Sequence, residues 1–209
     1  MGPKPKPPVD YIFQKTRAAV LMNVDKKAEP QFLVLKNGAY LTLRHADPDD
    51  AERLLCFVDR VAGESENLAF GPGEFELSVE QERAFLQRIA EESGSIYLVA
   101  EVAGEIAGTL TFMAGKRPRL QHAGELGLAI ARAYWNFGIG SQMLAYLIGW
   151  ARQNGTIRKI NLHVRVDNLP AIHLYEKYGF VHEGRITREF YLHGQFVDVY
   201  TMGLQLDPQ

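Results

Sequence analysis

The sequence predicts one mixed α/β domain behind a short N-terminal extension. The chain has 209 residues, of which 46% are hydrophobic and 23% charged, close to the average for a globular domain. Capping signals, turn signals and hydrophobic periodicity divide it into segments in the order β-α-α-β-β-β-α-β-α-β-β. We therefore expect residues 1–30 to form a flexible extension and residues 31–209 to form a single domain.

Composition also excludes several classes of protein. The net charge of −2 argues against a nucleic-acid-binding domain, which would be strongly basic. The single cysteine, Cys56, excludes an intramolecular disulfide, and the six histidines lack the spacing of a metal site. No apolar run approaches the roughly 20 residues that span a membrane, and no secretory signal is evident. We expect a cytoplasmic protein that binds no metal, nucleic acid or membrane.

The first segments differ in how strongly they predict structure. Residues 1–8, MGPKPKPP, are too rich in proline for a helix or strand. Residues 9–30 suit either one face of a short helix or the arm of a homodimer, and the sequence leaves both open. Residues 31–44 hold two apolar runs around Asn37-Gly38, which predicts a hairpin with a type I′ turn.

Two helices are expected next. The first covers about residues 48–62, because an N-cap, a proline and acidic residues stand at its start, and Cys56 should be a small core residue within it. A capping box at Ser78–Gln81 opens the second helix, which ends near Ser93. Between them lies an acidic loop, residues 63–77, with the glutamates Glu64, Glu66, Glu74 and Glu76.

The rest of the chain predicts mainly strands. We expect them over residues 96–102, 105–114, 123–130, 160–166, 180–192 and 196–204. Two helices interrupt this series. The first has Ile139, Met143, Leu147 and Trp150 spaced along one face, and the second covers residues 169–178.

A glycine turn follows the strand at residues 123–130. In the segment Glu125–Ser141 a strand runs into Gly138-Ile139-Gly140 and then into a helix, whose N-terminal N–H groups can bind phosphate. Met143 stands where a dinucleotide fingerprint needs its third glycine, and the lysine of an NTPase phosphate loop is absent. Alone, such a turn is more often a tightly packed corner.

A second motif, Asn168–Phe180, follows the strand at residues 160–166. Asn168 suits an N-cap, Pro170 fits the first helical turn and Gly179 ends the helix. Considered alone, Tyr175 could be a core aromatic residue whose hydroxyl reaches water.

Together, the motifs x-x-x-G-x-G and N-x-x-A-x-x-L-Y-x-x-x-G-F resemble those of the GNAT superfamily of acetyl-CoA-dependent N-acetyltransferases. The resemblance covers about residues 40–204. One departure is Trp135, where the family usually has Gln or Arg. The pair Tyr134-Trp135 looks like the variant in enzymes that acetylate ribosomal-protein N-termini and polyamines. The resemblance implies a mostly antiparallel central sheet flanked by helices, with the strands ending at Ile130 and Val166 splayed apart.

The resemblance also implies roles for the matched residues. The backbone of Leu128 and Ile130 would pair with pantetheine, and the Ile130 N–H would polarise the acetyl carbonyl. Backbone amides over Asn136–Ser141 would hold the pyrophosphate, Asn168 would bond the pantetheine arm and Tyr175 would protonate the departing thiolate. The implied acetyl-CoA site comprises Leu128, Ile130, Trp135, Asn136, Phe137, Gly138, Ile139, Gly140, Ser141, Asn168, Ala171 and Tyr175.

The implied chemistry needs an acid and a base. A phenol within hydrogen-bond reach can protonate a thiolate, which suits Tyr175. The attacking amine starts as an ammonium, so Glu125, acting through water, is the candidate base. Alternatively, Glu125 satisfies a strand edge or pairs with an arginine. His163 and His173 are expected near the cleft, as solvated or hydrogen-bonded side chains.

The acidic loop bears on the acceptor. In the resembled family this segment commonly forms one wall of the substrate cleft, so Glu64, Glu66, Glu74 and Glu76 would attract a cationic primary amine. Such an amine could be a polyamine, an aminoglycoside-like compound or a peptide N-terminus, and the alternative is a merely solvated loop. We expect an N-acetyltransferase that works by direct attack in a ternary complex. A catalytically silent acetyl-CoA-binding module and an enzyme for a larger acyl group are the alternatives.

Overall fold

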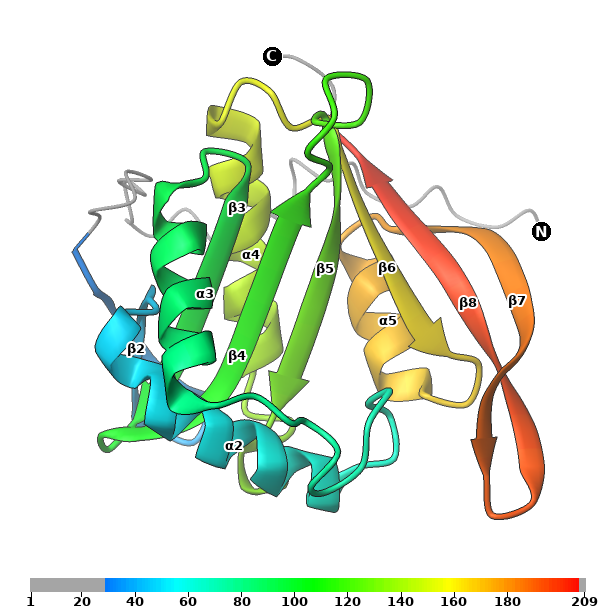
Figure 1. The fold of residues 1–209 in the computed structure, drawn as a ribbon, viewed down its shortest axis with the longest axis horizontal. Helices are drawn as coiled ribbons and strands as arrows, with labels where there is room; N and C mark the ends of the chain where they lie inside the picture. Colours follow the sequence, from blue (N-terminus) through cyan, green and yellow to red (C-terminus); the bar gives the residue numbers. More distant parts are fainter. Residues whose placement is uncertain (1–28, 207–209) are drawn as a thin grey trace, which may run out of the picture.

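The computed structural model describes residues 29–206, which form a layered α/β fold around one sheet (Figure 1). The eight strands have the order β1-β2-β3-β4-β5-β6-β8-β7, and every neighbouring pair is antiparallel except β5–β6. Their bounds are β1 Gln31–Val34, β2 Tyr40–His45, β3 Ser95–Val102, β4 Glu105–Ala114, β5 Ala123–Ile130, β6 Lys159–Arg165, β7 Val181–Leu192 and β8 Gln195–Gln205. The expected mixed, mostly antiparallel sheet is confirmed. Residues 1–28, most of the expected extension, lie outside the described residues.

Helices cover both faces of the sheet. Figure 1 shows α2 (Ala51–Glu64) and α3 (Val79–Glu91) in front of it, and α4 (Ile139–Gln153) and α5 (Leu169–Lys177) behind it. Short 3₁₀ turns, η1 (Pro48–Asp50) and η2 (Arg132–Tyr134), precede α2 and α4. Successive side chains of a strand pack on opposite faces of the sheet. In β3, Leu98 packs in the hydrophobic cluster that contains α4, whereas Tyr97 and Val99 pack in the cluster that contains α2 and α3. None of the helices in residues 29–206 has the length and apolar character needed to cross a membrane.

The predicted N-cap at Asp47 and the predicted capping box at Ser78 are both confirmed, and Asp47 also forms a capping box. At Asp47 the carboxylate accepts from the Asp49 N–H at 2.9 Å, and the Asp50 carboxylate accepts from the Asp47 N–H at 2.8 Å. At Ser78 the hydroxyl accepts from the Gln81 N–H at 3.2 Å, and the Gln81 side chain accepts from the Ser78 N–H at 2.8 Å. These bonds satisfy N–H groups that a helix start leaves without an intrahelical partner.

The type I′ prediction at Asn37-Gly38 is wrong. Gly38 has a φ of 84°, but Asn37 has no positive φ, which a type I′ turn requires at both central residues. The connection is wider, because the Leu35 N–H donates to the Ala39 carbonyl at 2.8 Å and the Asn37 side chain accepts from the Ala39 N–H at 3.1 Å. Two positive φ values occur instead in the other hairpins, at Ala103-Gly104 and His193-Gly194.

Cys56 is exposed, so its expected place in the core is also wrong. Helix α2 buries Ala51, Leu54, Phe57, Val61 and Ala62, which recur at helical spacing, and Cys56 lies outside this buried face.

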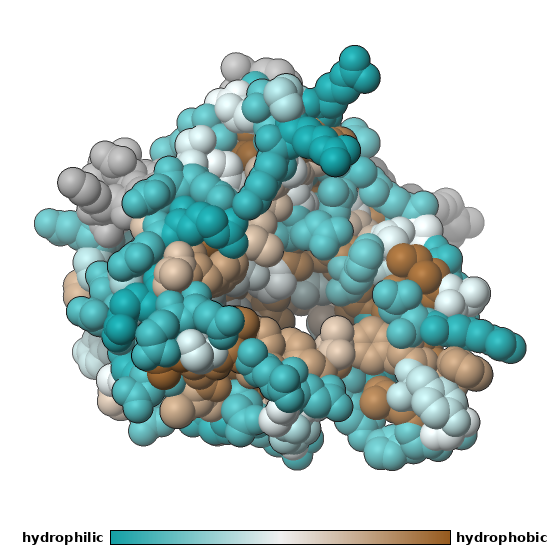
Figure 2. Space-filling model, viewed as in Figure 1, coloured by the Kyte–Doolittle hydropathy of each residue, from teal (hydrophilic) through white to brown (hydrophobic). Residues whose placement is uncertain are grey.

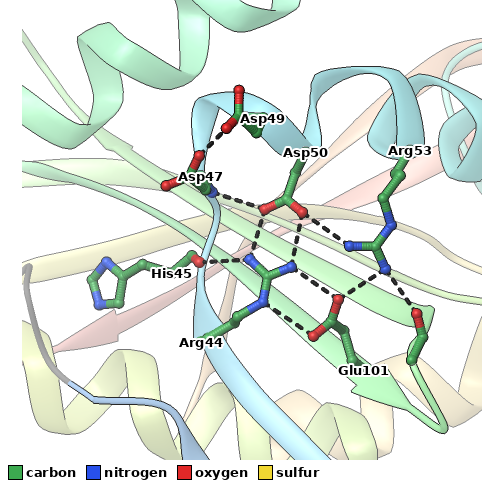
Figure 3. Close-up of polar contacts among 8 residues, drawn as sticks. Arg44, His45, Asp47, Asp49, Asp50, Arg53 and Glu101 are labelled. Atoms are coloured by element: carbon green, nitrogen blue, oxygen red, sulfur yellow. Dashed lines mark hydrogen bonds and ion pairs between the residues drawn. The ribbon is translucent and has the colours of Figure 1, made fainter.

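The start of α2 is fixed to the sheet by a network of charged side chains (Figure 3). The buried Asp50 carboxylate accepts from Arg44 of β2 at 2.6 and 2.8 Å and from Arg53 of α2 at 3.1 Å. Glu101 of β3 accepts from Arg44 at 2.9 and 3.1 Å and from Arg53 at 2.9 Å. Two strands and one helix therefore meet at four mutually paired charges.

The parallel pair β5–β6 opens part way along its length, as expected. Pairing covers only Ala123–Glu125 of β5 and Lys159–Asn161 of β6. Beyond this point β5 stays paired with β4, and β6 stays paired with β8. The two strands diverge in Figure 1, and the expected splay is confirmed.

Candidate active site

A cleft of about 860 Å³ lies where β5 and β6 separate. Its walls come from the end of β5, the turn before α4, the end of β6, and α5, with Ser65, Asn67 and Leu68 of the α2–α3 loop on one side. In the space-filling view an opening is visible at the place where Figure 1 shows β5 and β6 apart (Figure 2). The cleft brings together most of the acetyl-CoA site that the motifs implied; Phe137 instead packs against the core cluster of α4.

Two N–H groups of the β5 backbone face the cleft without a strand partner among residues 29–206. The Ala131 N–H donates to the Ala107 carbonyl of β4 at 3.0 Å. N–H groups alternate in direction along an antiparallel strand, so those of Leu128 and Ile130 point away from β4, into the gap. The Ile130 carbonyl points the same way and accepts from the Trp135 indole N–H at 2.7 Å. The Ile130 N–H remains directed at the space where a carbonyl oxygen could accept it.

The turn before α4 presents further N–H groups. Asn136 and Gly138 have φ values of 66° and 96°, so the backbone reverses twice before the helix begins. The first intrahelical bond runs from the Gln142 N–H to the Gly138 carbonyl at 3.1 Å, and Gly138 provides no side-chain cap. The N–H groups of Ile139, Gly140 and Ser141 therefore lie at the positive end of the helix without intrahelical acceptors.

Gly140 keeps the cleft open beside that turn. A Cβ atom at this position would lie 3.0 Å from Leu174 Cδ2 of α5 and 3.7 Å from Leu128 Cδ2 of β5. Any side chain at Gly140 would therefore enter the space between β5 and α5. Gly138 is needed for a different reason, because its φ is positive.

Helix α5 contributes Asn168 and Tyr175. The Asn168 side-chain oxygen accepts from the Ala171 N–H at 3.3 Å, which confirms the N-cap and leaves its NH₂ group for the cleft. Tyr175 is buried, lines the cleft, and packs against Phe180 with the ring centroids 5.7 Å apart. Burial raises the pKa of Tyr175 to about 12, so the phenol stays protonated at neutral pH. The neighbouring Tyr178 hydroxyl donates to the Ser141 carbonyl at 2.7 Å, which fixes α5 against α4.

The predicted base and the loop glutamates do not line the cleft. Glu125 is exposed and stands opposite Asn161 at the last paired position of β5 and β6, next to the opening. The Glu64 carboxylate accepts from the Arg132 N–H at 2.6 Å, Glu66 bonds with His193 at 2.7 Å, and Glu74 accepts from the Gly71 N–H at 2.7 Å. Glu76 is exposed. Their catalytic and acceptor-binding roles stay predictions.

Several lining residues carry charge or can do so. His163 and His173 line the cleft, as expected of their positions. The sequence analysis missed Lys36, Arg165, Asp167 and Lys177. Arg165 is buried; its guanidinium bonds to the Asp167 carboxylate at 2.8 and 3.0 Å and donates to the Glu66 carbonyl at 2.6 Å. The alternation of β6, with Ile160, Leu162 and Val164 in the core, could have placed Arg165 on the same face as His163, because they are two residues apart.

The family model and the relatives that match this chain all describe acetyltransferases. A model of the acetyltransferase (GNAT) family matches residues 63–180. The L-amino acid N-acetyltransferase AaaT of Escherichia coli is 34% identical over 116 residues, which cover 56% of this chain and 72% of the relative. The spermidine N(1)-acetyltransferase of Vibrio cholerae is 32% identical over 83 residues, which cover 40% of this chain and 48% of the relative.

Solved structures show the same fold. An acetyltransferase of the GNAT family from Streptococcus pneumoniae superposes with a TM-score of 0.77 at 38% identity, over 80% of this chain and 99% of that chain. The yncA protein of Salmonella typhimurium, a putative acetyltransferase solved with its cofactor acetyl-CoA, superposes with a TM-score of 0.71 at 20% identity, over 81% of this chain and 95% of that chain.

Proposed function

Because this chain belongs to the GNAT family of acetyltransferases, we propose that it transfers the acetyl group of acetyl-CoA to a primary amine. One observation carries the proposal. A single cleft joins the unpaired N–H groups of β5, the open N-terminus of α4 and the buried Tyr175. Each suits one part of acetyl-CoA: the pantetheine amides and acetyl carbonyl, the pyrophosphate, and the sulfur.

The residues of the cleft fit this co-substrate. Backbone N–H groups of Ile139–Ser141 would hold the pyrophosphate, aided by the dipole of α4. Leu128 and Ile130 would pair with the pantetheine arm through their backbone, and the Asn168 NH₂ group would bond to it from the other side. The acetyl carbonyl would then accept from the Ile130 N–H.

The reaction needs one bond to form and one to break. The amine nitrogen attacks the thioester carbon, the C–S bond breaks, a base takes a proton from the amine, and the thiolate accepts a hydrogen bond and a proton. Tyr175 is suited to that donation because its pKa of about 12 keeps the phenol protonated. For the same reason the rate should show no loss from Tyr175 ionisation until the pH approaches about 12.

Two side chains are candidates for the base. Glu125 stands beside the opening at the end of the β5–β6 pairing, from where it could act through water. His163 lines the cleft from β6, and an imidazole is a common general base in enzymes. The variants Glu125→Gln and His163→Gln separate them: loss of the true base should remove the acidic limb of the kcat/KM profile, and the other variant should keep it.

The acceptor is proposed to be a cationic primary amine. Glu64, the last residue of α2, precedes the three loop residues that line the cleft, and Glu66 lies between two of them. Their charge would raise the local concentration of cations. The relatives described above are named for transfer to L-amino acids and to spermidine, which both carry a primary amine.

The function is tested by following thiol release from acetyl-CoA with a panel of amines. The panel should contain spermidine, L-amino acids, an aminoglycoside and peptides with a free N-terminus, with a reaction that lacks enzyme as the control. Amine-dependent thiol release only in the presence of the enzyme supports the proposal. Binding of acetyl-CoA without turnover on any amine would favour the silent binding module instead.

A further inference from the structure

We infer that Lys36, in the connection between β1 and β2, binds a phosphate group of acetyl-CoA, an inference that rests on the proposed function. Lys36 lines the cleft although it lies about 100 positions before the glycine turn in the chain. Its Cε atom is 3.9 Å from the position that a Cβ atom would take on Gly138. The ammonium group, one bond further along, therefore lies beside the turn whose N–H groups are proposed to hold the pyrophosphate.

The hairpin is fixed where it can place this cation. Leu35 and Leu41 are buried in the cluster that contains α4, so the backbone on both sides of the connection is anchored to the core. The Lys36 N–H also points at the Phe137 carbonyl of the glycine turn, with 3.5 Å between nitrogen and oxygen. The backbone of Lys36 is therefore held beside the glycine turn.

The glycine turn contributes no cation of its own to the cleft lining. Its own segment has one basic residue, Arg132, whose guanidinium lies over the Trp135 ring at 5.5 Å and outside the cleft lining. Neutral N–H groups and a helix dipole do not neutralise a pyrophosphate, which carries two charges near pH 7.

The other two basic side chains of the cleft lining, Arg165 and Lys177, already contact other side chains. Arg165 is paired with Asp167, and Lys177 lies over the Tyr178 ring at 5.7 Å. Within residues 29–206, no carboxylate pairs with Lys36. A lysine ammonium with three donors on a flexible stem is a common phosphate ligand.

Calorimetric titration with acetyl-CoA tests the inference. Lys36→Gln should weaken binding about tenfold, as the loss of one charge-assisted hydrogen bond does, and the difference should shrink as salt is added. Lys36→Arg should retain most of the affinity because it keeps the charge. The matched control is Lys116→Gln, since Lys116 is an exposed lysine of the β4–β5 connection that does not line the cleft. It should bind like the wild type.

A phosphate-free thioester shows which part of the co-substrate Lys36 contacts. With S-acetylpantetheine, kcat/KM should be equal for the wild type and Lys36→Gln. Equal acetyl-CoA affinity of Lys36→Gln and Lys116→Gln, or a similar loss with S-acetylpantetheine, would overturn the inference. Wild-type protein that fails to bind acetyl-CoA would overturn the proposed function as well, so the two failures are distinguishable. Matching melting temperatures would show that the variants are folded.

Discussion

Replacing Asp50 by asparagine should measure what the charged network at the start of α2 contributes to stability. Asp50 is 5% exposed, and its carboxylate accepts four hydrogen bonds, three from Arg44 and Arg53 and one from the Asp47 N–H. The asparagine keeps the shape but loses the charge and turns one acceptor oxygen into a donor that faces an arginine. Removing one partner of a buried ion pair costs about 3–5 kcal/mol.

Because Glu101 still pairs with Arg44 and Arg53, we expect the lower end of that range, about 3 kcal/mol. For a domain of this size this lowers the melting temperature by about 6–12 °C. Urea unfolding followed by circular dichroism gives the free energy of unfolding. Asp49→Asn is the matched control, because it removes the same charge from an exposed neighbour. Equal stability of the two variants would refute the assignment of Asp50 as the centre of the network.

The same variant has a pH signature. Burial alone would raise the pKa of Asp50, but the hydrogen bonds from Arg44 and the Asp47 N–H outweigh it, and the pKa lies below its ordinary value. A lowered carboxyl pKa stabilises the fold above the unfolded-state value of about 3.9, and this contribution is lost as the pH falls through the folded-state value. The stability difference between wild type and Asp50→Asn should be constant above about pH 5 and narrow below about pH 4.

Three further predictions concern the cleft. Gly140→Asp should abolish acetyl-CoA binding in calorimetry while the far-ultraviolet circular dichroism stays native, because its side chain fills the gap beside Leu174 and brings a negative charge to the phosphate turn; unchanged affinity would contradict the proposed site. Tyr175→Phe should lower kcat about 100-fold or more with little change in acetyl-CoA affinity, and near wild-type kcat would leave Tyr175 as a packing residue. Changing Glu64, Glu66, Glu74 and Glu76 together to glutamine should raise the KM of a cationic amine more than it lowers kcat, and the effect should become smaller as salt is added. An unchanged KM at low salt would show that these carboxylates do not attract the acceptor.

Local patterns predicted the elements because their causes are local. The capping boxes at Asp47 and Ser78 join residues three apart, and the strands of the core alternate with period two. The second motif was informative for the same reason: Asn168 caps the helix that carries Tyr175 seven positions later. The turn at Asn37-Gly38 was mispredicted because the prediction considered only these two residues. The hydrogen bond that closes the wider loop joins Leu35 and Ala39, which lie outside that pair.

The missed parts of the site depend on contacts between distant segments. Lys36 reaches the glycine turn about 100 residues away, and Arg165 holds the Glu66 carbonyl 99 residues away. No spacing within either segment encodes such a contact. For the acidic segment the sequence showed the charge but not the partners. Glu64 bonds to the Arg132 N–H and Glu66 bonds to His193, and neither contact could be predicted from the spacing of the glutamates.

The bond between the Trp135 indole and the Ile130 carbonyl joins the end of β5 to the glycine turn. This bond links the proposed oxyanion donor directly to the proposed phosphate-binding turn, and we expect the distance between them to vary little. We therefore expect the protein to discriminate among acyl donors by the length of the arm that joins their phosphate groups to the thioester. A carrier with a shortened arm could fill either end of the cleft, but not both at once.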